Sequence, residues 1–239
     1  MGQLKMRRRE DGFYVTGPDK EVFNDSYVRI PNTYLGSPVV GIAKGAFEKF
    51  QYVEKAFIEE GVKIIEEYAF CSCENLTEIF LPSSLTEIGE GAFAMCHNLR
   101  RIILPDKVET IAGDAFEFCV KLRYVVLPHA LKSITPGAFH AAGGAFVPTV
   151  KRYENGQIFL KPDEAKLADK ENYGIMFWIP KSNFSNYIGS LPNYSVLYYE
   201  GSENDAETEW SNYKGKRPAS LNFYRYNVSK EEMLEFLYQ

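Results

Sequence analysis

The sequence predicts an α/β solenoid, a stack of near-identical coils in which each coil buries an apolar face on its neighbour. The pair Ala-Phe recurs five times at intervals of 23 residues, and several other apolar positions keep the same interval. A single globular core requires no such period, whereas a stack of equal coils does. The five pairs begin at Ala46, Ala69, Ala92, Ala115 and Ala138.

The repeated unit combines two local periodicities that assign its elements. Read over Leu76–Cys96, the unit is L-x-x-I-x-L-P-x-x-L-x-x-I-x-x-x-A-F-x-x-C. Residues 78–81 alternate with the period of a short strand, and Pro82 follows where a missing N–H is tolerated. The apolar residues of 92–99 follow helical spacing. We therefore expect a parallel sheet of short strands and, on the opposite side, short helical turns.

The residues around each Ala-Phe pair have predictable packing roles. Each phenylalanine is expected to fill the space between two coils, where its loss leaves a cavity. Glycine precedes three of the five alanines, and we expect these small residues to let one coil lie close on the next. They are Gly45, Gly91 and Gly137.

The four cysteines do not have the spacing of a metal site. Three of them, Cys73, Cys96 and Cys119, follow the repeat, and Phe50 occupies the same position one coil earlier. Structural zinc sites use paired cysteines with two to four residues between them, whereas Cys71 and Cys73 are separated by one residue. We expect free thiols that pack as small apolar groups, with Cys71 the one at the surface. No metal and no cofactor is predicted.

No group of residues in the sequence predicts catalysis. His97, His129 and His140 lie at no metal-binding spacing and near no nucleophile motif. Gly143-Gly144 lacks the lysine and hydroxyl residue of a phosphate loop. Nothing brings a nucleophile, a base and an orienting group together, so the sequence predicts no catalytic residues and a protein that is not an enzyme.

Charge and hydropathy exclude two classes of partner. The net charge of −5 and the pI of about 5.4 provide no general basic field for nucleic acid or anionic lipid. One basic cluster, residues 5–9, is expected to be a frayed, solvated terminus. We find no apolar run long enough to span a membrane, and the N-terminus has no apolar stretch of the kind found in signal peptides.

The 23-residue unit resembles the BspA-like (LRR_5) family of leucine-rich repeats. Residues 28–31, Val-Arg-Ile-Pro, and 36–42, Gly-Ser-Pro-Val-Val-Gly-Ile, are similar to the family's opening strand and first coil. Residues 197–201, followed by Trp210, are similar to its degenerate closing unit. The resemblance covers about 28–140 closely and 174–226 loosely. It implies a solenoid that binds proteins, often a microbial adhesin that is secreted or held at the cell surface, with a host or matrix protein as partner.

We divide the chain into four parts: an N-terminal cap, regular leucine-rich repeats, an insertion or linker, and irregular repeats with a C-terminal cap helix. These parts span residues 1–29, 30–148, 149–173 and 174–239.

The last two parts also contain predicted elements. Ser229 and Glu232 form the capping box of the final helix, which is expected to cover the end of the stack. A short surface helix is expected over 163–171, strands over 175–180, 195–199 and 221–226, and short helices over 181–188 and 206–213.

Outward positions of the predicted strands form the candidate site. In each strand they flank an inward apolar residue, and the second of them is apolar in four successive coils. An apolar stripe beside varied charges is typical of a protein-binding face. Two alternatives are that strand propensity alone selects these residues, or that the C-terminal coils fold over them. The candidate protein-binding residues are Lys55, Phe57, Glu78, Phe80, Arg101, Ile103, Tyr124 and Val126.

The sequence thus predicts a monomeric, non-enzymatic protein-binding module that resembles an adhesin. The expected location is the cell surface or the exterior if a leader is removed, and otherwise the cytoplasm. One alternative is a cytosolic scaffold or interaction protein. Another is a glycan-binding module that uses C-terminal aromatic residues, namely Trp178, Tyr198, Tyr199, Tyr224 and Tyr226.

Overall fold

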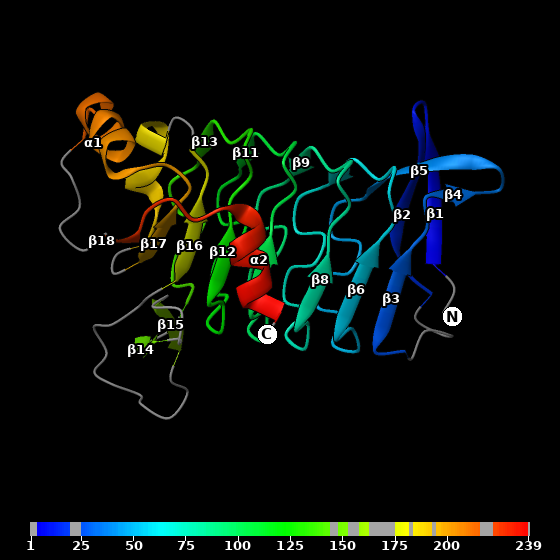
Figure 1. Ribbon diagram of the computed structural model, residues 1–239. Coiled ribbons are helices and arrows are strands. Elements are labelled where there is room, and N and C mark those ends of the chain that lie inside the picture. The colour runs from blue at the N-terminus through cyan, green and yellow to red at the C-terminus, as the bar shows by residue number, and fades with distance from the viewer. Residues whose placement is uncertain are drawn as a thin grey trace.

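The computed structural model of the protein is an elongated solenoid of about six turns (Figure 1). It describes residues 4–19, 25–143, 148–152, 158–162, 175–181, 184–192, 195–215 and 222–238. Each regular coil contributes a short strand to one sheet, a two-residue strand to a second sheet, and a turn to a third side. The predicted solenoid is confirmed, and the second sheet is an addition to it.

The first sheet runs the length of the stack, and its strands are parallel. The register follows the repeat, since Lys55 pairs with Glu78 and Arg101 with Tyr124. A three-stranded part and a five-stranded part meet where β8 lies beside β10. The strands are β3 (Tyr27–Ile30), β6 (Lys55–Ile58), β8 (Glu78–Phe80), β10 (Arg101–Ile103), β12 (Tyr124–Val126), β16 (Met176–Ile179), β17 (Val196–Tyr199) and β18 (Asn222–Arg225).

The second sheet begins with a hairpin and continues as one strand from each coil. Its members from the coils are β5 (Ser37–Ile42), β7 (Ile64–Ile65), β9 (Glu87–Ile88), β11 (Thr110–Ile111) and β13 (Ser133–Ile134), all parallel. A short strand β4 (Thr33–Tyr34) pairs with β5 in an antiparallel hairpin.

The third side consists of turns, so the predicted helical turns are not helices. Within each turn the backbone alternates its hydrogen bonds: the Phe70 N–H donates to Ala92 O of the next coil (2.8 Å), whereas the Cys71 N–H donates to Tyr68 O (3.0 Å). Left-handed residues at Tyr68 and Ser72 (φ of 56° and 57°) turn the peptide groups toward the next coil. Lateral bonding between coils thus replaces the i to i−4 bonding of a helix.

The glycines before the alanines belong to this alternation. Gly91 has a φ of 57°, and a Cβ there would lie 2.4 Å from the ring of Tyr68. The expected close approach is therefore present at Gly91, together with a left-handed backbone. Tyr68 and Asp114 take the same left-handed conformation in their coils without glycine.

The core is a continuous column between the three sides. The five phenylalanines of the Ala-Phe pairs stack almost parallel, with ring centroids 5.0 to 5.6 Å apart, as between Phe47 and Phe70 and between Phe70 and Phe93. All five are buried. The predicted role of these rings in filling the space between coils is confirmed.

The basic cluster lies in an ordered strand, contrary to the expectation of a frayed terminus, although its basic side chains are exposed as expected. Strand β1 (Leu4–Arg9) pairs antiparallel with β2 (Gly12–Pro18), and β2 pairs with β5 at the head of the second sheet. Phe13 and Val15 of β2 are buried in the main core. The hairpin therefore covers the first coil, because its apolar side chains pack against the exposed end of the stack.

The irregular C-terminal part continues the first sheet, since β12, β16, β17 and β18 are parallel neighbours. The strands predicted over 175–180, 195–199 and 221–226 are present. Where short helices were predicted there are two 3-10 turns, η1 (Phe184–Asn186) and η2 (Ile188–Ser190), and helix α1 (Glu203–Asn212). Between the regular and irregular parts lies an antiparallel pair, β14 (Pro148–Arg152) and β15 (Ile158–Pro162). The helix predicted over 163–171 lies outside the described residues.

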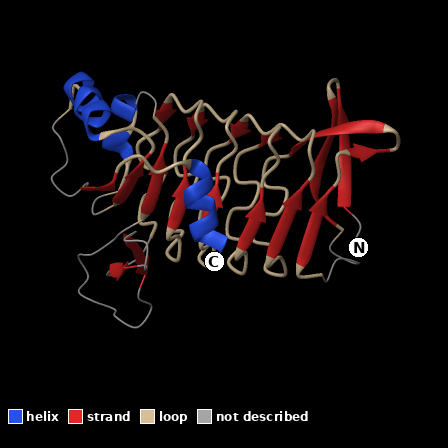
Figure 2. Cartoon of the chain, in the orientation of Figure 1, coloured by secondary structure: helices blue, strands red, loops and turns tan. Residues whose placement is uncertain are grey.

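The final helix, α2 (Lys230–Tyr238), lies across the outer surface of the first sheet rather than over the end of the stack (Figures 1 and 2). Ser229 caps its first turn, because the N–H of Glu232 donates to the hydroxyl of Ser229 (3.1 Å), which is one of the two bonds of the predicted capping box. Where this helix lies decides which part of the strand surface meets solvent.

Candidate functional site

The eight candidate residues lie in two rows on the outer surface of the first sheet. Pairing between β6 and β8 aligns Lys55 with Glu78 and Phe57 with Phe80. Pairing between β10 and β12 continues both rows at each strand's first and last residue. The remaining four members are Arg101, Ile103, Tyr124 and Val126.

The first row is a chain of ion pairs. The Lys55 ammonium lies 3.0 Å from the Glu78 carboxylate, which also accepts a hydrogen bond from the Arg101 guanidinium. Burial alone would raise the pKa of Glu78, but the hydrogen bonds from Lys55 and Arg101 outweigh it and lower the pKa. One carboxylate thus serves two cations, and this row carries an excess of positive charge.

The second row changes from exposed to buried along the stack. Phe57 and Phe80 are each 37% exposed, and their ring centroids are 6.1 Å apart. Ile103 is half-buried, and Val126 has no exposed surface. The candidate stripe is therefore open at its N-terminal end and covered at its C-terminal end.

Helix α2 covers the C-terminal end of these rows. Met233 and Phe236 pack with Val126, Trp178 and Tyr198 in a small core separate from the main one. This arrangement corresponds to one of the alternatives weighed from the sequence, in which C-terminal residues fold over the strands.

Two polar contacts hold α2 in place. The indole N–H of Trp178 donates to Val228 O (2.8 Å), just before the helix. At the other end the Arg101 guanidinium donates to Leu237 O (3.0 Å) and lies 4.6 Å from the centroid of the Tyr238 ring. Arg101 thus satisfies a carbonyl at the C-terminus of the helix, where a cation is favoured.

The remaining uncovered area is named here the open strand face. It consists of six outward residues on three neighbouring strands. Tyr27 is 44% exposed, and Arg29 binds the Glu59 carboxylate at 2.6 Å with its guanidinium 5.8 Å from the ring of Phe57. The six residues are Tyr27, Arg29, Lys55, Phe57, Glu78 and Phe80.

Sequence reasoning missed Tyr27 and Arg29 because β3 precedes β6 by 28 residues, outside the 23-residue interval. A signal for them was present. Ile30-Pro31 ends β3 in the way that Leu81-Pro82 follows β8, so alignment on the proline would have placed both residues in the two rows.

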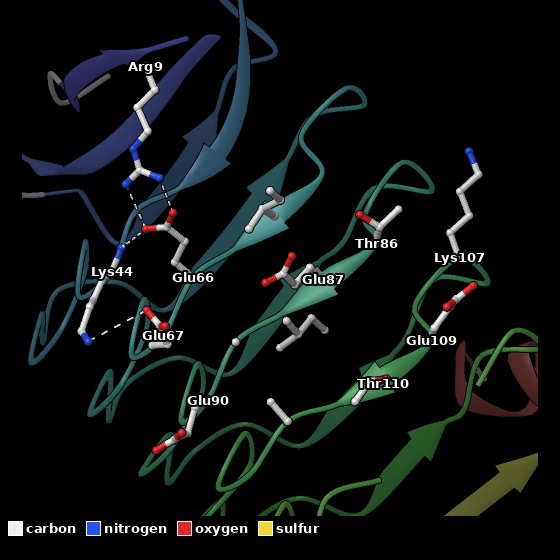
Figure 3. A pocket seen from close by; sticks show the side chains of 14 residues that line it. Arg9, Lys44, Glu66, Glu67, Thr86, Glu87, Glu90, Lys107, Glu109 and Thr110 are labelled. Carbon is white, nitrogen blue, oxygen red and sulfur yellow. Dashed lines mark hydrogen bonds and ion pairs between the residues drawn. The ribbon is translucent and has the colours of Figure 1, made fainter. Parts of the chain in front are cut away.

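A second concave region, of about 1040 Å³, lies on the outer surface of β7, β9 and β11 (Figure 3). Glu66 accepts hydrogen bonds from the Arg9 guanidinium and from the Lys44 N–H (2.9 Å). These bonds outweigh burial and lower the pKa of Glu66. The Arg9 guanidinium also lies 3.8 Å from the centroid of the Tyr14 ring. The contacts of Arg9 at this end of the groove therefore join the N-terminal hairpin to the solenoid.

The other carboxylates of the groove do not converge on a common point. Glu90 accepts the hydroxyl of Tyr68 (3.0 Å), and Glu109 pairs with Lys132 (2.7 Å). Within the described ranges there is no group of three or more His, Cys, Asp or Glu residues that could hold a metal. The charged residues of the groove thus form separate pairs that join neighbouring coils.

All four cysteines are free and buried, so the expectation that Cys71 is exposed is wrong. The repeat thiols do more than fill space, because each donates to a phenylalanine carbonyl of the preceding coil. Cys73 donates to Phe47 O (3.1 Å) and Cys96 to Phe70 O (3.2 Å). Burial raises the pKa of Cys73 to about 12 and that of Cys96 well above its usual value.

The aromatic residues named for glycan binding lie mostly in the interior. Trp178, Tyr198 and Tyr199 are buried, so their ring faces are not available to a sugar. Tyr226 is half-buried against Tyr199, with ring centroids 6.5 Å apart, and the side chain of Tyr224 lies outside the described residues.

Across the described part of the chain, no helix combines the length and the apolar composition needed to cross a membrane.

Comparison with solved structures finds other solenoids of this type. A leucine-rich repeat protein of T. pallidum is 32% identical, with a TM-score of 0.55, over 60% of this chain and 66% of that one. The pneumococcal vaccine antigen PcpA is 18% identical, with a TM-score of 0.56, over 94% of this chain and 48% of that one. This chain thus spans just under two thirds of the first protein and about half of the second. No curated protein matches.

The family model named BspA type leucine rich repeat region matches residues 19–143 in six copies, which is more than half of the chain. The matched range contains the five Ala-Phe pairs and the first five strands of the first sheet. The chain belongs to the family of BspA-type leucine-rich-repeat proteins.

Proposed function

We propose that this protein is a non-enzymatic binding module that recognises another protein through the open strand face. The observation that carries the proposal is the exposed pair Phe57 and Phe80, which lies on a rigid sheet beside Tyr27 and the cations Arg29 and Lys55. Aromatic residues and arginine supply most of the binding energy at protein interfaces. Membership of a leucine-rich-repeat family supports protein binding as the general activity.

The partner proposed is a host or matrix protein, met at the microbial cell surface. BspA-type proteins are often associated with the cell surface. PcpA, a structural neighbour, is a pneumococcal vaccine antigen. The fixed spacing of the strands favours a protein partner, since it offers a broad surface rather than an enclosed pocket.

The test measures binding of the purified chain to immobilised fibronectin, laminin and collagen by biolayer interferometry. The variant Phe57→Glu/Phe80→Glu is expected to lose at least about thirtyfold in affinity, because it places two charges at the centre of the contact. Its thermal unfolding should stay close to that of the parent chain, since both rings are partly exposed.

The matched control is Phe118→Glu, because Phe118 is 38% exposed and lies on the turn side of the solenoid. This variant should bind as the parent does. If the double variant binds as well as the control, the open strand face is not the binding site. If the parent chain binds none of the three proteins, a matrix partner is excluded.

A further inference from the structure

The open strand face and the surface beneath α2 are one continuous stripe. The register places Phe57 and Phe80 in the same row as Val126 and Trp178. Helix α2 buries the last two, while the first two are each 37% exposed. One stripe of outward apolar side chains is thus occupied by a helix at one end and unoccupied at the other.

A cavity of about 410 Å³ lies at the border between the two halves. Its apolar lining includes Leu81, which follows β8, and Ile103 of β10. Lys230, in the first turn of α2, forms part of its rim. The cavity can therefore receive an apolar side chain from a segment that lies beside α2 and over Phe80.

Helix α2 shows which chemistry this surface accepts. Met233 and Phe236, three residues apart, are buried, and Leu237 is partly buried beside them. The ring of Phe236 lies edge-on to Tyr124 with centroids 6.1 Å apart. Apolar side chains at positions i, i+3 and i+4 of a helix are thus sufficient to bury this surface.

The charges at this border indicate which charged residues a helix bound beside α2 would carry on its polar side. Glu78 is shared between Lys55 and Arg101, so one of the two cations is in excess. Lys107, on the rim of the cavity, is exposed and has no ion-pair partner among the residues that the structure describes. Two carboxylates also line the cavity, Glu60 and Asp106, and Asp106 is paired with Lys230. With Glu60 set against Lys107, the border keeps an excess of one positive charge in a chain whose net charge is −5, and this excess complements carboxylates.

We infer that the open strand face binds an amphipathic α-helix of the partner protein, which lies beside α2. Apolar residues at i, i+3 and i+4 of that helix pack on Phe57 and Phe80 and enter the cavity. Carboxylates on its flank meet Lys55, Arg101 and Lys107. The inference rests on the proposed function and specifies its partner: an acidic amphipathic helix.

Fluorescence anisotropy of stapled helical peptides tests this inference with the full chain. The first probe has leucine at i, i+3, i+4 and i+7 and glutamate elsewhere. The second has the same composition in scrambled order, and the third has lysine in place of glutamate. The first peptide is expected to bind at least about tenfold more tightly than either of the others. Phe80→Ser should remove that advantage, and Phe118→Ser should leave it unchanged.

Three outcomes would overturn the inference. The first is equal affinity for the ordered and scrambled peptides. The second is an affinity that does not respond to Phe80→Ser. The third is dimerisation of the chain by light scattering that Phe80→Ser abolishes, since the occupant is then a second copy. If the peptides fail while matrix-protein binding still depends on Phe57 and Phe80, the proposed function stands and the helical partner is rejected.

Discussion

The phenylalanine of each Ala-Phe pair stabilises the stack through the rings of the coils before and after it. Phe93 is fully buried between Phe70 and Phe116, at 5.6 Å from each. The backbone on both sides is fixed by hydrogen bonds between coils, so the space left by a smaller side chain cannot collapse.

Replacement of Phe93 by alanine is therefore expected to cost about 3–5 kcal/mol in the free energy of unfolding. Urea titration followed by circular dichroism measures this difference. Phe118→Ala is the matched control, because Phe118 is partly exposed, and its cost should stay below about 1 kcal/mol. Equal losses in the two variants would show that ring stacking between coils is not a main source of stability.

The thiols of the three repeat cysteines are buried and therefore protected from modification. Burial raises the pKa of Cys119 to about 12, and its thiol donates to Phe93 O (3.1 Å). We expect Cys73, Cys96 and Cys119 to resist N-ethylmaleimide at pH 8 in the folded protein and to react fully in urea. Intact-mass spectrometry counts the adducts. Rapid alkylation of all three thiols in the folded protein would contradict their burial.

At the scale of elements, a charged cluster joins the start of α2 to two coils. His129 lies 2.9 Å from Asp106 and 3.2 Å from Glu200, and Lys230 of α2 binds Asp106 at 2.5 Å. Burial would lower the pKa of His129, but hydrogen bonds to Asp106 and Glu200 outweigh it and raise the pKa above its usual value of 6.5. Hydrogen bonds from Lys230 and His129 likewise outweigh burial and lower the pKa of Asp106 to about 2.

These shifts predict how stability depends on pH. The raised pKa of His129 means that its contribution is complete below pH 6.5 and is lost as pH rises through the folded value. The melting temperature of the parent chain should therefore exceed that of His129→Gln most at pH 5 to 6, and the gap should narrow toward pH 9. A gap that widens with rising pH would show that His129 is bound as the neutral form.

Helix α2 is held by a small core of its own, separate from the main one. Phe236→Ala should therefore loosen the helix without unfolding the solenoid. Hydrogen exchange is expected to increase over residues 229–238 and to stay unchanged over the turns that contain Phe70 and Phe93. An increase over both regions would mean that α2 and the coils unfold as one unit.

The regular coils form a one-dimensional stack, because the strands of each coil pair with those of the adjacent coils. Deletion of residues 77–99 removes one full repeat of 23 residues. It places Leu76 directly before Arg100, the position that the equivalent residue Leu99 has in the parent chain. Phe70 would then stack on Phe116. We expect a folded protein with a lower melting temperature and one cooperative transition by circular dichroism.

Deletion of residues 77–88 is the control, because it breaks the 23-residue interval and brings unlike parts of the coil into register. This variant should not fold cooperatively. If both deletions fold equally well, the coils are less interdependent than the structure indicates. If neither folds, the stack depends on contacts that span more than one coil.

Much of the fold could be predicted from the sequence because the period and the pattern within it are local. The alternation at Ile79 and Leu81 assigned the strands, and the Ala-Phe interval assigned their register. The turns could not be predicted as such, since the apolar spacing of 92–99 fits a helix equally well. Hydrogen bonds to the next coil, such as Phe93 N–H to Ala115 O, decide between the two.

For the candidate site, the sequence identified which side chains point outward, because the strand period fixes that. It could not show which of them are exposed. Val126 and Phe80 occupy equivalent positions in their coils, yet Val126 is buried and Phe80 is not. The difference comes from α2, and Arg101 and Leu237, which join that helix to the strands, are 136 residues apart in the chain.

The sequence by itself determined the solenoid, its 23-residue repeat, its parallel strands, and the buried rows of Ala-Phe pairs and cysteines. These features follow from the sequence because each coil packs on the next through the same kind of interface, repeated every 23 residues. Only the tertiary structure decided how the N-terminal hairpin covers the first coil and how α2 covers part of the first sheet, and therefore where the strand surface stays exposed. Those contacts join segments far apart in the chain, and their free energy depends on shape and charge that no local period records.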